Sequence, residues 1–507
     1  MIKKIFGPPG TGKTTTLLNI VDQYIKKGTD LNRIGYFAFT RKAANEAKDR
    51  MLERNQNLDK KDLKYFQTLH SFAFHTLGMS EDSVMQPIHY EQIGKELNLR
   101  VVDSGDESGY LNFNSEYFKL INKARVKNIS VEEEFNTNEW SSDIDYETLG
   151  HIYSNYNHFK GKHLYDFNDM INKFVKEKEK CKEFDVVFID EAQDLSPIQW
   201  DMFDVLKEKS NDVYLAGDDD QAIFAWAGAD VKRFLNEPAE EQILPYSNRV
   251  PKNIQTLSNV IVNRIQTRKQ KEYLPKKGSL GKVEFINNIE HINLNKEKWL
   301  ILTRTTYRSD EISEQLKQNN LYFKNRFGKS YNTRLYKAII NFGELCKGQA
   351  IPLADAREIC EFLNIDNSPR VTNNKQYYDI NDFGFKNDSV WYDLFTEADQ
   401  DECFYIRTML SNNEKLSQAP RIEVSTIHAA KGGECDNVIL VLDNAKKIRE
   451  AIENNIEKAD EEHRVWYVGA TRAKENLYLL KPKKERYGYQ LWQQKICLKK
   501  LSHKKSR

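Results

Sequence analysis

The chain has 507 residues, of which 39% are hydrophobic and 30% charged, which excludes a disordered or collagen-like protein and indicates several globular domains. Its 76 Lys and Arg residues against 75 Asp and Glu residues give a net charge of +1, so any nucleic-acid surface has to be a local patch. The six cysteines contain no C-x-x-C pair, and no apolar run reaches the about 18 residues of a membrane span. The start Met1-Ile2-Lys3-Lys4 does not resemble a signal peptide, so we expect a cytoplasmic protein with reduced thiols, in the host cytoplasm if it is viral.

The first fifty residues alternate between strand-like and helix-like segments. An apolar run at 2–6 precedes the sequence GPPGTGKT, and a helical pattern follows from Thr14 to about Lys27. A second strand-like run covers 33–39, before a helical pattern from 41 to 51. This order predicts an α/β fold with a parallel sheet.

Further buried strands are predicted along the chain, and their continuous apolar runs are typical of sheets covered on both faces. They are expected at 185–190, 212–217, 299–303, 421–427 and 437–442. Two stretches differ in composition and look like insertions into α/β domains. Residues 79–160 are polar, rich in aromatic side chains and mostly helix-like, and residues 345–418 are mixed with an acidic stretch at 397–402. The last stretch, 481–507, holds ten Lys and Arg against one Glu, which indicates either a solvated terminus or a phosphate-contacting tail.

The sequence GPPGTGKT fits the pattern G-x-x-x-x-G-K-[ST] of a phosphate-binding loop between a strand and a helix. Glycines let backbone N–H groups turn toward phosphate oxygens, and the helix N-terminus favours an anion. Lys13 is expected to reach the β- and γ-phosphates, and the Thr14 hydroxyl to ligate Mg²⁺. The predicted nucleotide-binding residues of this loop are Gly7, Pro8, Pro9, Gly10, Thr11, Gly12, Lys13, Thr14 and Thr15.

The sequence FDVVFIDEAQD ends a hydrophobic strand with two carboxylates. Asp190 at the strand end is expected to hold the Mg²⁺ ion, and Glu191 to orient and deprotonate an attacking water, which indicates hydrolysis. Taken alone, the pair is equally compatible with a solvated acidic strand end.

With these motifs the chain resembles superfamily 1 helicases of the UvrD/Rep type, and the resemblance runs in order from Gly7 to Ala473. The matching blocks are AFTRKAANEA (38–47), TLHSF (68–72), DFNDM (166–170), GDDDQAIFAWAGA (217–229), LPYSNRVP (244–251), VSTIHAAKGGE (424–434) and EEHRVWYVGATRA (461–473). The resemblance implies two RecA-like domains with ATP between them, each carrying a mainly helical insertion. The expected boundaries are 1–78 with 161–248 for the first domain, 79–160 for its insertion, 249–344 with 419–482 for the second domain, 345–418 for its insertion and 483–507 for a basic tail. Lys13 and Asp190 are 177 residues apart in the sequence, which independently demands an insertion, because a βαβ unit needs far fewer residues.

The resemblance also assigns roles near the nucleotide. Gln221 corresponds to a glutamine that senses the γ-phosphate, and Arg249 and Arg472 to arginines that neutralise charge in the transition state. Glu434 corresponds to a residue that contacts the ribose. Outside these motifs, either arginine would more often be an ordinary surface residue.

For DNA, the resemblance implies that aromatic side chains stack on single-strand bases, a contact that is independent of sequence. The aromatic candidates are Phe39, Phe224 and Trp226, with a hydrophobic-core role as the alternative for each. Contacts to phosphate, or coupling of the DNA to ATP, are expected from Thr40, His70 and His428.

Two departures from the family pattern concern the adenine base. Family members usually carry a glutamine before the phosphate loop that reads adenine, whereas six residues without a Gln precede Gly7 here. The aromatic residue that stacks on adenine is replaced by Asn248, and Tyr246 is the candidate substitute. We therefore expect weaker discrimination between ATP and other NTPs than is typical. A third departure is AKGGEC, which has Gly433 where a larger apolar residue is usual.

The resemblance implies an ATP- and Mg²⁺-dependent DNA helicase that moves 3′→5′ on single-stranded DNA and unwinds duplex. A monomer that binds single strands and single-strand/duplex junctions, and no membrane, is expected; DNA repair and DNA replication are both compatible with it. Two alternatives are a translocase that displaces proteins with little unwinding, and a nucleotide-gated DNA-binding assembly factor.

Overall fold

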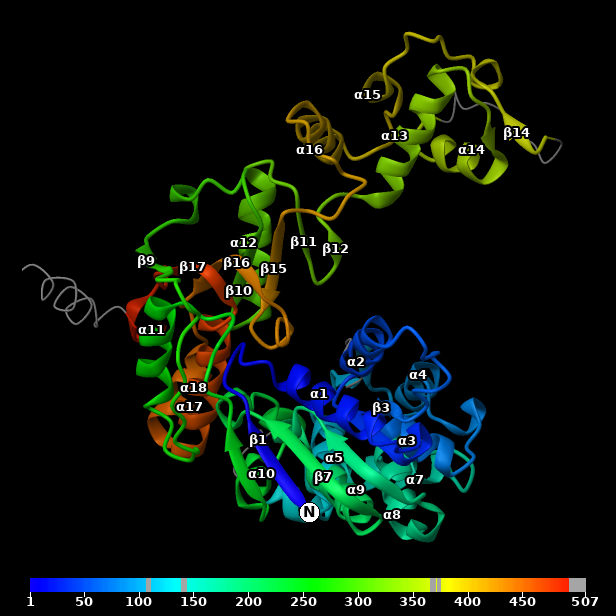
Figure 1. Cartoon of the computed structure of the whole chain (residues 1–507). Coiled ribbons are helices and arrows are strands. Elements are labelled where there is room, and N and C mark those ends of the chain that lie inside the picture. The colour runs from blue at the N-terminus through cyan, green and yellow to red at the C-terminus, as the bar shows by residue number, and fades with distance from the viewer. Residues whose placement is uncertain (106–110, 138–143, 365–370, 372–374, 492–507) are drawn as a thin grey trace, which may run out of the picture. The chain divides into compact units, whose positions relative to one another are not determined.

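The computed structural model describes residues 1–105, 111–137, 144–364, 371 and 375–491. The chain divides into two compact units, Met1–Leu280 with Ala451–Thr471, and Gly281–Glu450 with Arg472–Arg507. Each unit contains its own mainly parallel sheet with helices, which confirms the predicted α/β class (Figure 1). Of the basic tail, residues 492–507 lie outside the described residues.

The first unit is built on a six-stranded sheet whose paired strands are all parallel. The strand order is β3-β2-β6-β7-β1-β8. The strands are β1 (Ile2–Phe6), β2 (Ile34–Ala38), β3 (Phe66–Thr68), β6 (Phe184–Ile189), β7 (Ser210–Gly217) and β8 (Glu240–Ile243). The phosphate-binding strand β1 therefore lies between β7 and β8, and β6 lies between β2 and β7.

Successive residues of these strands point to opposite faces, and both faces are buried. Ile5 and Tyr36 pack with one set of helices, while their neighbours Phe6 and Phe37 pack with another. The first set is α1 (Lys13–Lys26) and α2 (Arg41–Arg54). The second set is α3 (Leu69–Thr76), α8 (Phe167–Lys176), α9 (Pro197–Glu208) and α10 (Val231–Asn236).

Residues between α3 and α8 form a mainly helical part of this unit with a separate hydrophobic core. Its helices are α4 (Pro87–Glu96), α5 (Glu116–Lys127), α6 (Val131–Phe135) and α7 (Tyr146–Lys160), and β4 (Val102–Gly105) pairs with β5 (Leu111–Phe113). Tyr90, Phe118, Leu149 and Tyr156 lie at the centre of that core.

Two further helices of the first unit, α11 (Lys252–Val262) and α18 (Ile456–Ala470), come from residues that we assigned by sequence to the second domain. They pack against each other. Arg464 of α18 donates to the backbone carbonyls of Thr267, at 2.5 Å, and of Asp219, at 2.8 Å, after β7. These bonds connect α18 to the residues that follow β7 and α11. The domain boundaries given above remain predictions.

The second unit is built on a seven-stranded sheet of order β12-β11-β15-β10-β16-β17-β9, in which the β11–β12 pair is antiparallel and the other pairs are parallel. The strands are β9 (Lys282–Ile286), β10 (Trp299–Thr303), β11 (Phe323–Asn325), β12 (Gly328–Lys329), β15 (Ile422–Thr426), β16 (Cys435–Val441) and β17 (Ala473–Leu480). Helix α12 (Thr306–Gln318) packs on one face through Ile312 and Leu316. Helix α17 (Lys446–Asn454) follows β16.

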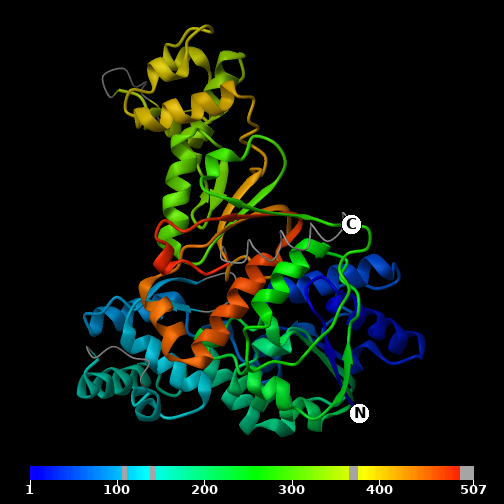
Figure 2. The same ribbon diagram turned by 90° about the vertical axis from the view of Figure 1, so that its left-hand side faces the viewer.

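A second group of helices, yellow-green to orange in Figure 2, also has its own core, which begins at Tyr322, before the boundary expected at 345. Its helices are α13 (Thr333–Cys346), α14 (Leu353–Cys360), α15 (Trp391–Leu394) and α16 (Gln400–Ser411), and β13 (Ile351–Pro352) pairs with β14 (Tyr377–Tyr378). Phe342, Phe395 and Ile406 lie in this core. Among the described residues, helices of membrane-spanning length and hydrophobicity are absent.

Candidate active site

The predicted nucleotide-binding motifs follow neighbouring strands of the first sheet. The phosphate loop follows β1, the Asp190–Glu191 pair follows β6, and Gln221 lies in a 3₁₀ turn after β7. Because the carboxyl ends of parallel strands meet at one edge of a sheet, the fold brings these motifs together at that edge.

The phosphate loop has a backbone that requires glycine. Gly10 and Gly12 have φ angles of 73° and 82°, in the left-handed region that strongly favours glycine. At Gly7, a Cβ atom would lie 1.9 Å from the Cγ atom of Lys13, so a side chain there would displace the lysine stem. The glycine spacing of the motif is therefore explained by the fold.

Carbonyl groups of the loop are engaged by hydrogen bonds from the loop itself and from α1. The Pro8 carbonyl accepts from the Thr11 N–H at 3.1 Å and from the Thr11 hydroxyl at 2.8 Å. The Gly12 carbonyl accepts from the Thr16 N–H at 2.8 Å. Lys13 Nζ donates to the Gly7 carbonyl at 3.3 Å.

The segment after β8 binds the same loop from outside. Ser247 donates its hydroxyl to the Pro9 carbonyl at 2.7 Å, and the Asn248 N–H donates to the Gly10 carbonyl at 2.8 Å. A Cβ atom on Gly10 would lie 2.3 Å from the Arg249 Cβ atom, so the first atoms of Arg249 pack directly against the loop.

Asp190 is the buried centre of the predicted metal site. Its Oδ2 atom accepts hydrogen bonds from the Thr14 hydroxyl and from the Tyr36 hydroxyl, both at 2.8 Å. Burial, together with the nearby charge of Glu191, raises the pKa of Asp190 above its ordinary value.

These residues fit a bound Mg²⁺ ion. Thr14 and Asp190 supply two converging oxygen atoms, the ligand type that Mg²⁺ prefers. A divalent cation would also favour the ionised form of the buried Asp190 carboxyl, whose pKa is otherwise raised by burial.

Glu191 has an unusual backbone conformation, with φ = 57° in the left-handed region, where a residue with a side chain is uncommon. Its carboxylate lies 3.4 Å from Lys13 Nζ and accepts a hydrogen bond of 2.6 Å from the Gln193 side-chain amide. Strained backbone of this kind is frequent at functional sites. The conformation aims the carboxylate at the predicted phosphate-binding lysine.

Gln221 connects to Glu191 through two other residues, Asp218 and Gln193. Gln221 Nε2 donates to Asp218 Oδ2 at 2.6 Å, and the Asp218 N–H donates to Gln193 Oε1 at 2.9 Å. Gln193, which is fully buried, in turn holds Glu191. The predicted γ-phosphate sensor and the predicted general base are therefore held by one hydrogen-bonded chain.

Asp218 begins a row of three buried aspartates whose carboxylate oxygens lie within 4.8 Å of one another. Such a group is compatible with a metal ion, but the ammonium group of Lys271 lies among the three carboxylates. The Lys271 ammonium group therefore occupies the position that a metal ion would take among these carboxylates.

Three predicted residues lie in the second unit. Arg472, directly before β17, is 1% exposed and donates to the Gly433 carbonyl at 3.1 Å. A carboxylate oxygen of Glu434 lies 3.7 Å from Lys474 Nζ. His428 follows β15, and burial, with the charge of Arg304, lowers its pKa to about 3.

The three predicted DNA-stacking aromatics form one row in the first unit. The Phe39 ring, after β2, stacks on Phe224 with ring centroids 5.5 Å apart and an interplanar angle of 23°. Phe224 contacts Trp226 edge-on at 6.3 Å. Phe224 is 8% exposed and Trp226 is 46% exposed, so Trp226 offers the accessible ring.

Thr40 and His70 both have structural roles in the fold. The Thr40 hydroxyl caps α2 by accepting a hydrogen bond of 3.1 Å from the Ala43 N–H. His70 on α3 contacts the Phe167 ring edge-on, and burial, with the charge of Arg41, lowers its pKa to about 4.

Sequence reasoning missed several residues of this site. Tyr36, Gln193 and Asp218 lie inside recognised strands or motifs, but their partners are distant in sequence. Lys271 carried no signal in its local sequence TRKQK, because its partners lie about fifty residues earlier.

Comparison with known proteins matches two family models to the chain. Residues 3–242 match the UvrD/REP helicase N-terminal domain, and residues 374–484 match the UvrD-like helicase C-terminal domain. Together the two models cover more than half of the chain.

Individual relatives are similar at low identity. An ATP-dependent DNA helicase PcrA of Staphylococcus aureus is 23% identical over 78% of this chain and 58% of its own length. A "Probable DNA helicase II homolog" of Mycoplasma capricolum is 25% identical over 63% of this chain and 45% of its own length. The PcrA of Staphylococcus epidermidis is 22% identical over 83% and 62%. The aligned part of the chain therefore spans about half to three fifths of these relatives.

Proposed function

The chain belongs to the UvrD/Rep family of superfamily 1 helicases, and on this premise we propose that it is an ATP-dependent DNA helicase moving 3′→5′ along single-stranded DNA. The observation that carries the proposal is the shared edge of the first sheet. Asp190 follows β6, whose two neighbours are β2, which leads to Phe39, and β7, which leads to Phe224. A change at the nucleotide therefore acts on the same strands that position the aromatic row.

In this proposal the phosphate loop and Lys13 bind the β- and γ-phosphates of ATP. Thr14 and Asp190 would hold Mg²⁺, which when bound neutralises phosphate oxygens and the charge that develops on them. Glu191 accepts the proton of the attacking water as general base, a role worth about 10²- to 10⁴-fold in rate. Gln221 orients the water or the γ-phosphate, and Arg249, held at the loop, stabilises transition-state charge.

Trp226, with the Phe224 and Phe39 rings behind it, is proposed to stack on bases of the single strand. Stacking is insensitive to sequence, as a motor that moves along any DNA requires. The roles of Arg472, Glu434 and His428 stand as predictions from the family resemblance.

ATPase activity with and without single-stranded DNA tests the proposal. We expect strong stimulation by the single strand. Lys13→Ala should abolish hydrolysis, because this lysine is proposed to contact the β- and γ-phosphates of ATP and not the DNA. The Kd for single-stranded DNA should change by less than about twofold. Lys26→Ala, at the exposed far end of α1, is the matched control and should hydrolyse ATP like the unmodified protein.

Forked duplexes with one single-stranded tail test direction. A fork with only a 3′ tail should be unwound, and a fork with only a 5′ tail should not. Unwinding from the 5′ tail would reject the proposed polarity. Stimulated hydrolysis without unwinding would identify a protein-displacing translocase, and the absence of stimulation would identify a nucleotide-gated assembly factor.

A further inference from the structure

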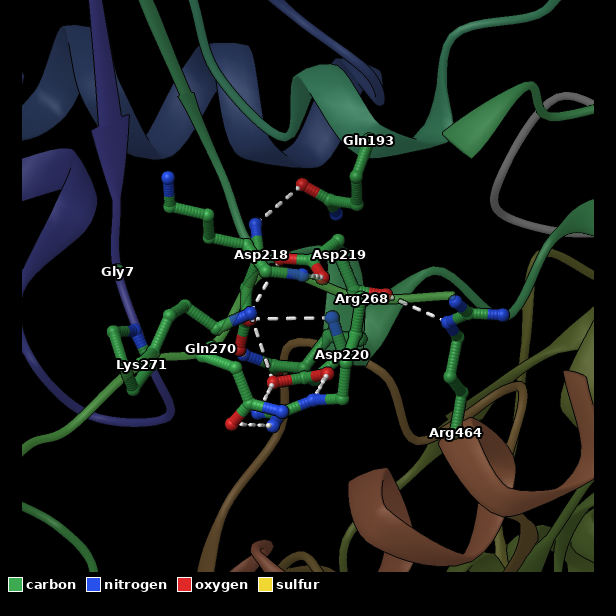
Figure 3. Close-up of polar contacts among 12 residues, drawn as sticks. Gly7, Gln193, Asp218, Asp219, Asp220, Arg268, Gln270, Lys271 and Arg464 are labelled. Carbon is green, nitrogen blue, oxygen red and sulfur yellow. Dashed lines mark hydrogen bonds and ion pairs between the residues drawn. The ribbon is translucent and has the colours of Figure 1, made fainter. Parts of the chain in front are cut away.

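A buried lysine lies at the centre of the acidic turn that carries Gln221 (Figure 3). The Lys271 side chain is 1% exposed, and its Nζ atom lies 3.2 Å from Asp218 Oδ1 and 2.8 Å from Asp220 Oδ2. It also forms a short hydrogen bond with Asp219. Buried carboxylates are costly without an opposite charge, so this ammonium group stabilises all three.

The residues around Lys271 clamp the same turn. Arg268 makes a two-pronged contact with both carboxylate oxygens of Asp220, each at 2.7 Å. The Lys269 N–H donates to Asp219 Oδ2 at 2.8 Å. Arg464 of α18 donates to the Asp219 carbonyl at 2.8 Å. The turn is therefore fixed by the segment after α11 and by α18, and it has little freedom of its own.

Asp218 connects the fixed turn to Gln221 and Glu191, the side chains proposed to act in hydrolysis. One of its carboxylate oxygens contacts Lys271, and the other accepts the Gln221 side-chain amide at 2.6 Å. Its N–H donates to Gln193, which holds the Glu191 carboxylate at 2.6 Å. One residue, Asp218, therefore connects Lys271 to the predicted γ-phosphate sensor Gln221. Asp218 and Gln193 together connect Lys271 to the predicted general base Glu191.

We propose that Lys271 is a positioning residue for ATP hydrolysis, which orients Gln221 and Glu191 through Asp218. The inference rests on the proposed function, because it assumes that these two side chains act on the γ-phosphate and the attacking water. Without the Lys271 ammonium group, the Asp218 carboxylate loses the opposite charge beside its Oδ1 atom and is no longer held from that side, which disturbs the hydrogen bond that its Oδ2 atom accepts from Gln221.

The charges of the turn are consistent with this role. Three carboxylates face two basic side chains, Lys271 and Arg268. Burial, opposed by Lys271 and reinforced by the neighbouring aspartates, raises the pKa of Asp219 to about 6. Interactions with the three aspartates outweigh burial and raise the pKa of Lys271, so this lysine stays charged at neutral pH.

Lys271→Met, which keeps length but removes the charge, tests the inference through steady-state hydrolysis. We expect kcat to fall at least tenfold, with the KM for ATP and the Kd of a fluorescent ATP analogue changed less than threefold, because the phosphate loop is intact. Lys277→Met, in the same connection but exposed, is the control and should match the unmodified protein. An unchanged kcat for Lys271→Met would overturn the inference.

A second variant separates positioning from general stability. Lys271→Met combined with Asp219→Asn removes one negative charge without touching the Asp218–Gln221 bond. We expect the double variant to regain thermal stability while kcat stays low. Recovery of both stability and kcat would show a purely structural lysine and overturn the inference. If the unmodified protein itself fails to hydrolyse ATP, the proposed function fails instead.

Discussion

Position 248 distinguishes this chain from the family pattern at the nucleotide. The Asn248 N–H binds the Gly10 carbonyl at 2.8 Å, so this residue is held at the phosphate loop with an amide where the family has an aromatic ring. Tyr246, two residues earlier, is 59% exposed. An exposed ring in this segment offers stacking area to any base, without hydrogen bonds that select adenine.

We therefore predict comparable turnover of ATP and GTP. Tyr246→Ala should raise the KM for both nucleotides by about fivefold or more, since stacking of a base on an aromatic ring contributes roughly 1–3 kcal/mol. Steady-state hydrolysis of each nucleotide measures this. Tyr307→Ala, which removes a similarly exposed tyrosine of the second unit, is the control. Strict dependence on ATP would contradict the prediction.

At the residue scale, sequence predicted the groups that lie inside short motifs. Lys13, Thr14, Asp190 and Glu191 meet as expected, because each follows a strand of one parallel sheet. Lys271 could not be predicted, because its role depends on a turn about fifty residues earlier in the chain. A series of hydrogen bonds between side chains of different helices, strands and loops produces no periodic pattern in the sequence.

The aromatic row leads to a prediction at the element scale. Trp226→Ala should weaken single-strand binding by roughly 1–3 kcal/mol, because stacking is lost while phosphate contacts remain. The slope of affinity against salt concentration should stay unchanged, since that slope reports released counterions. Fluorescence anisotropy at several salt concentrations measures both quantities.

The control for Trp226 is Phe327→Ala, which removes a ring that is 75% exposed in the second unit. A shallower salt slope for Trp226→Ala would argue against stacking and for an indirect effect on basic residues. Affinity equal to that of the unmodified protein would remove Trp226 from the proposed DNA surface.

In the two large sheets, the strands with long apolar runs were predicted, whereas six short or polar strands were not; these are β3, β8, β9, β11, β12 and β17, and β11 and β17 lie inside the second sheet. β2, β6 and β10 are continuous apolar runs, because both of their faces are covered. The unpredicted β3 and β8 form the two edges of the first sheet, and β8 is polar and mostly exposed. β9 is an edge of the second sheet, with alternating charged and apolar residues. A strand of three residues, such as β3, or one with two charged side chains, such as β8 and β17, carries a weaker hydrophobic signal.

The whole molecule contains two compact units with separate cores, and unfolding should reflect this. We expect more than one transition in differential scanning calorimetry, because two-state unfolding is typical of small single domains. A non-hydrolysable ATP analogue with Mg²⁺ should raise the transition of the first unit, which contains the phosphate loop. Lys13→Ala is the control for that shift. One sharp transition that moves as a whole would contradict the expectation.

At this scale the sequence indicated two α/β sheets and two helical stretches, and the limits that it gave for the domains remain predictions. The core of the second helical group begins at Tyr322, and α18 belongs to the first compact unit. The local residue composition does not show which compact unit a segment belongs to, because that depends on long-range hydrogen bonds such as those of Arg464.

In the phosphate loop, most backbone carbonyl oxygens already accept hydrogen bonds from within the chain. The carbonyl oxygens of Gly7, Pro8, Pro9, Gly10 and Gly12 each accept a hydrogen bond from the chain. A partial negative charge that is already paired repels an incoming anion less, so the loop turns a donor-rich surface to its ligand. Two of the five acceptors, those of Pro9 and Gly10, are masked by residues 247 and 248, some 240 positions later in the chain. The affinity of this short glycine-rich turn for anions is therefore set partly by a remote segment, and a peptide of the loop alone would bind phosphate more weakly than the folded chain.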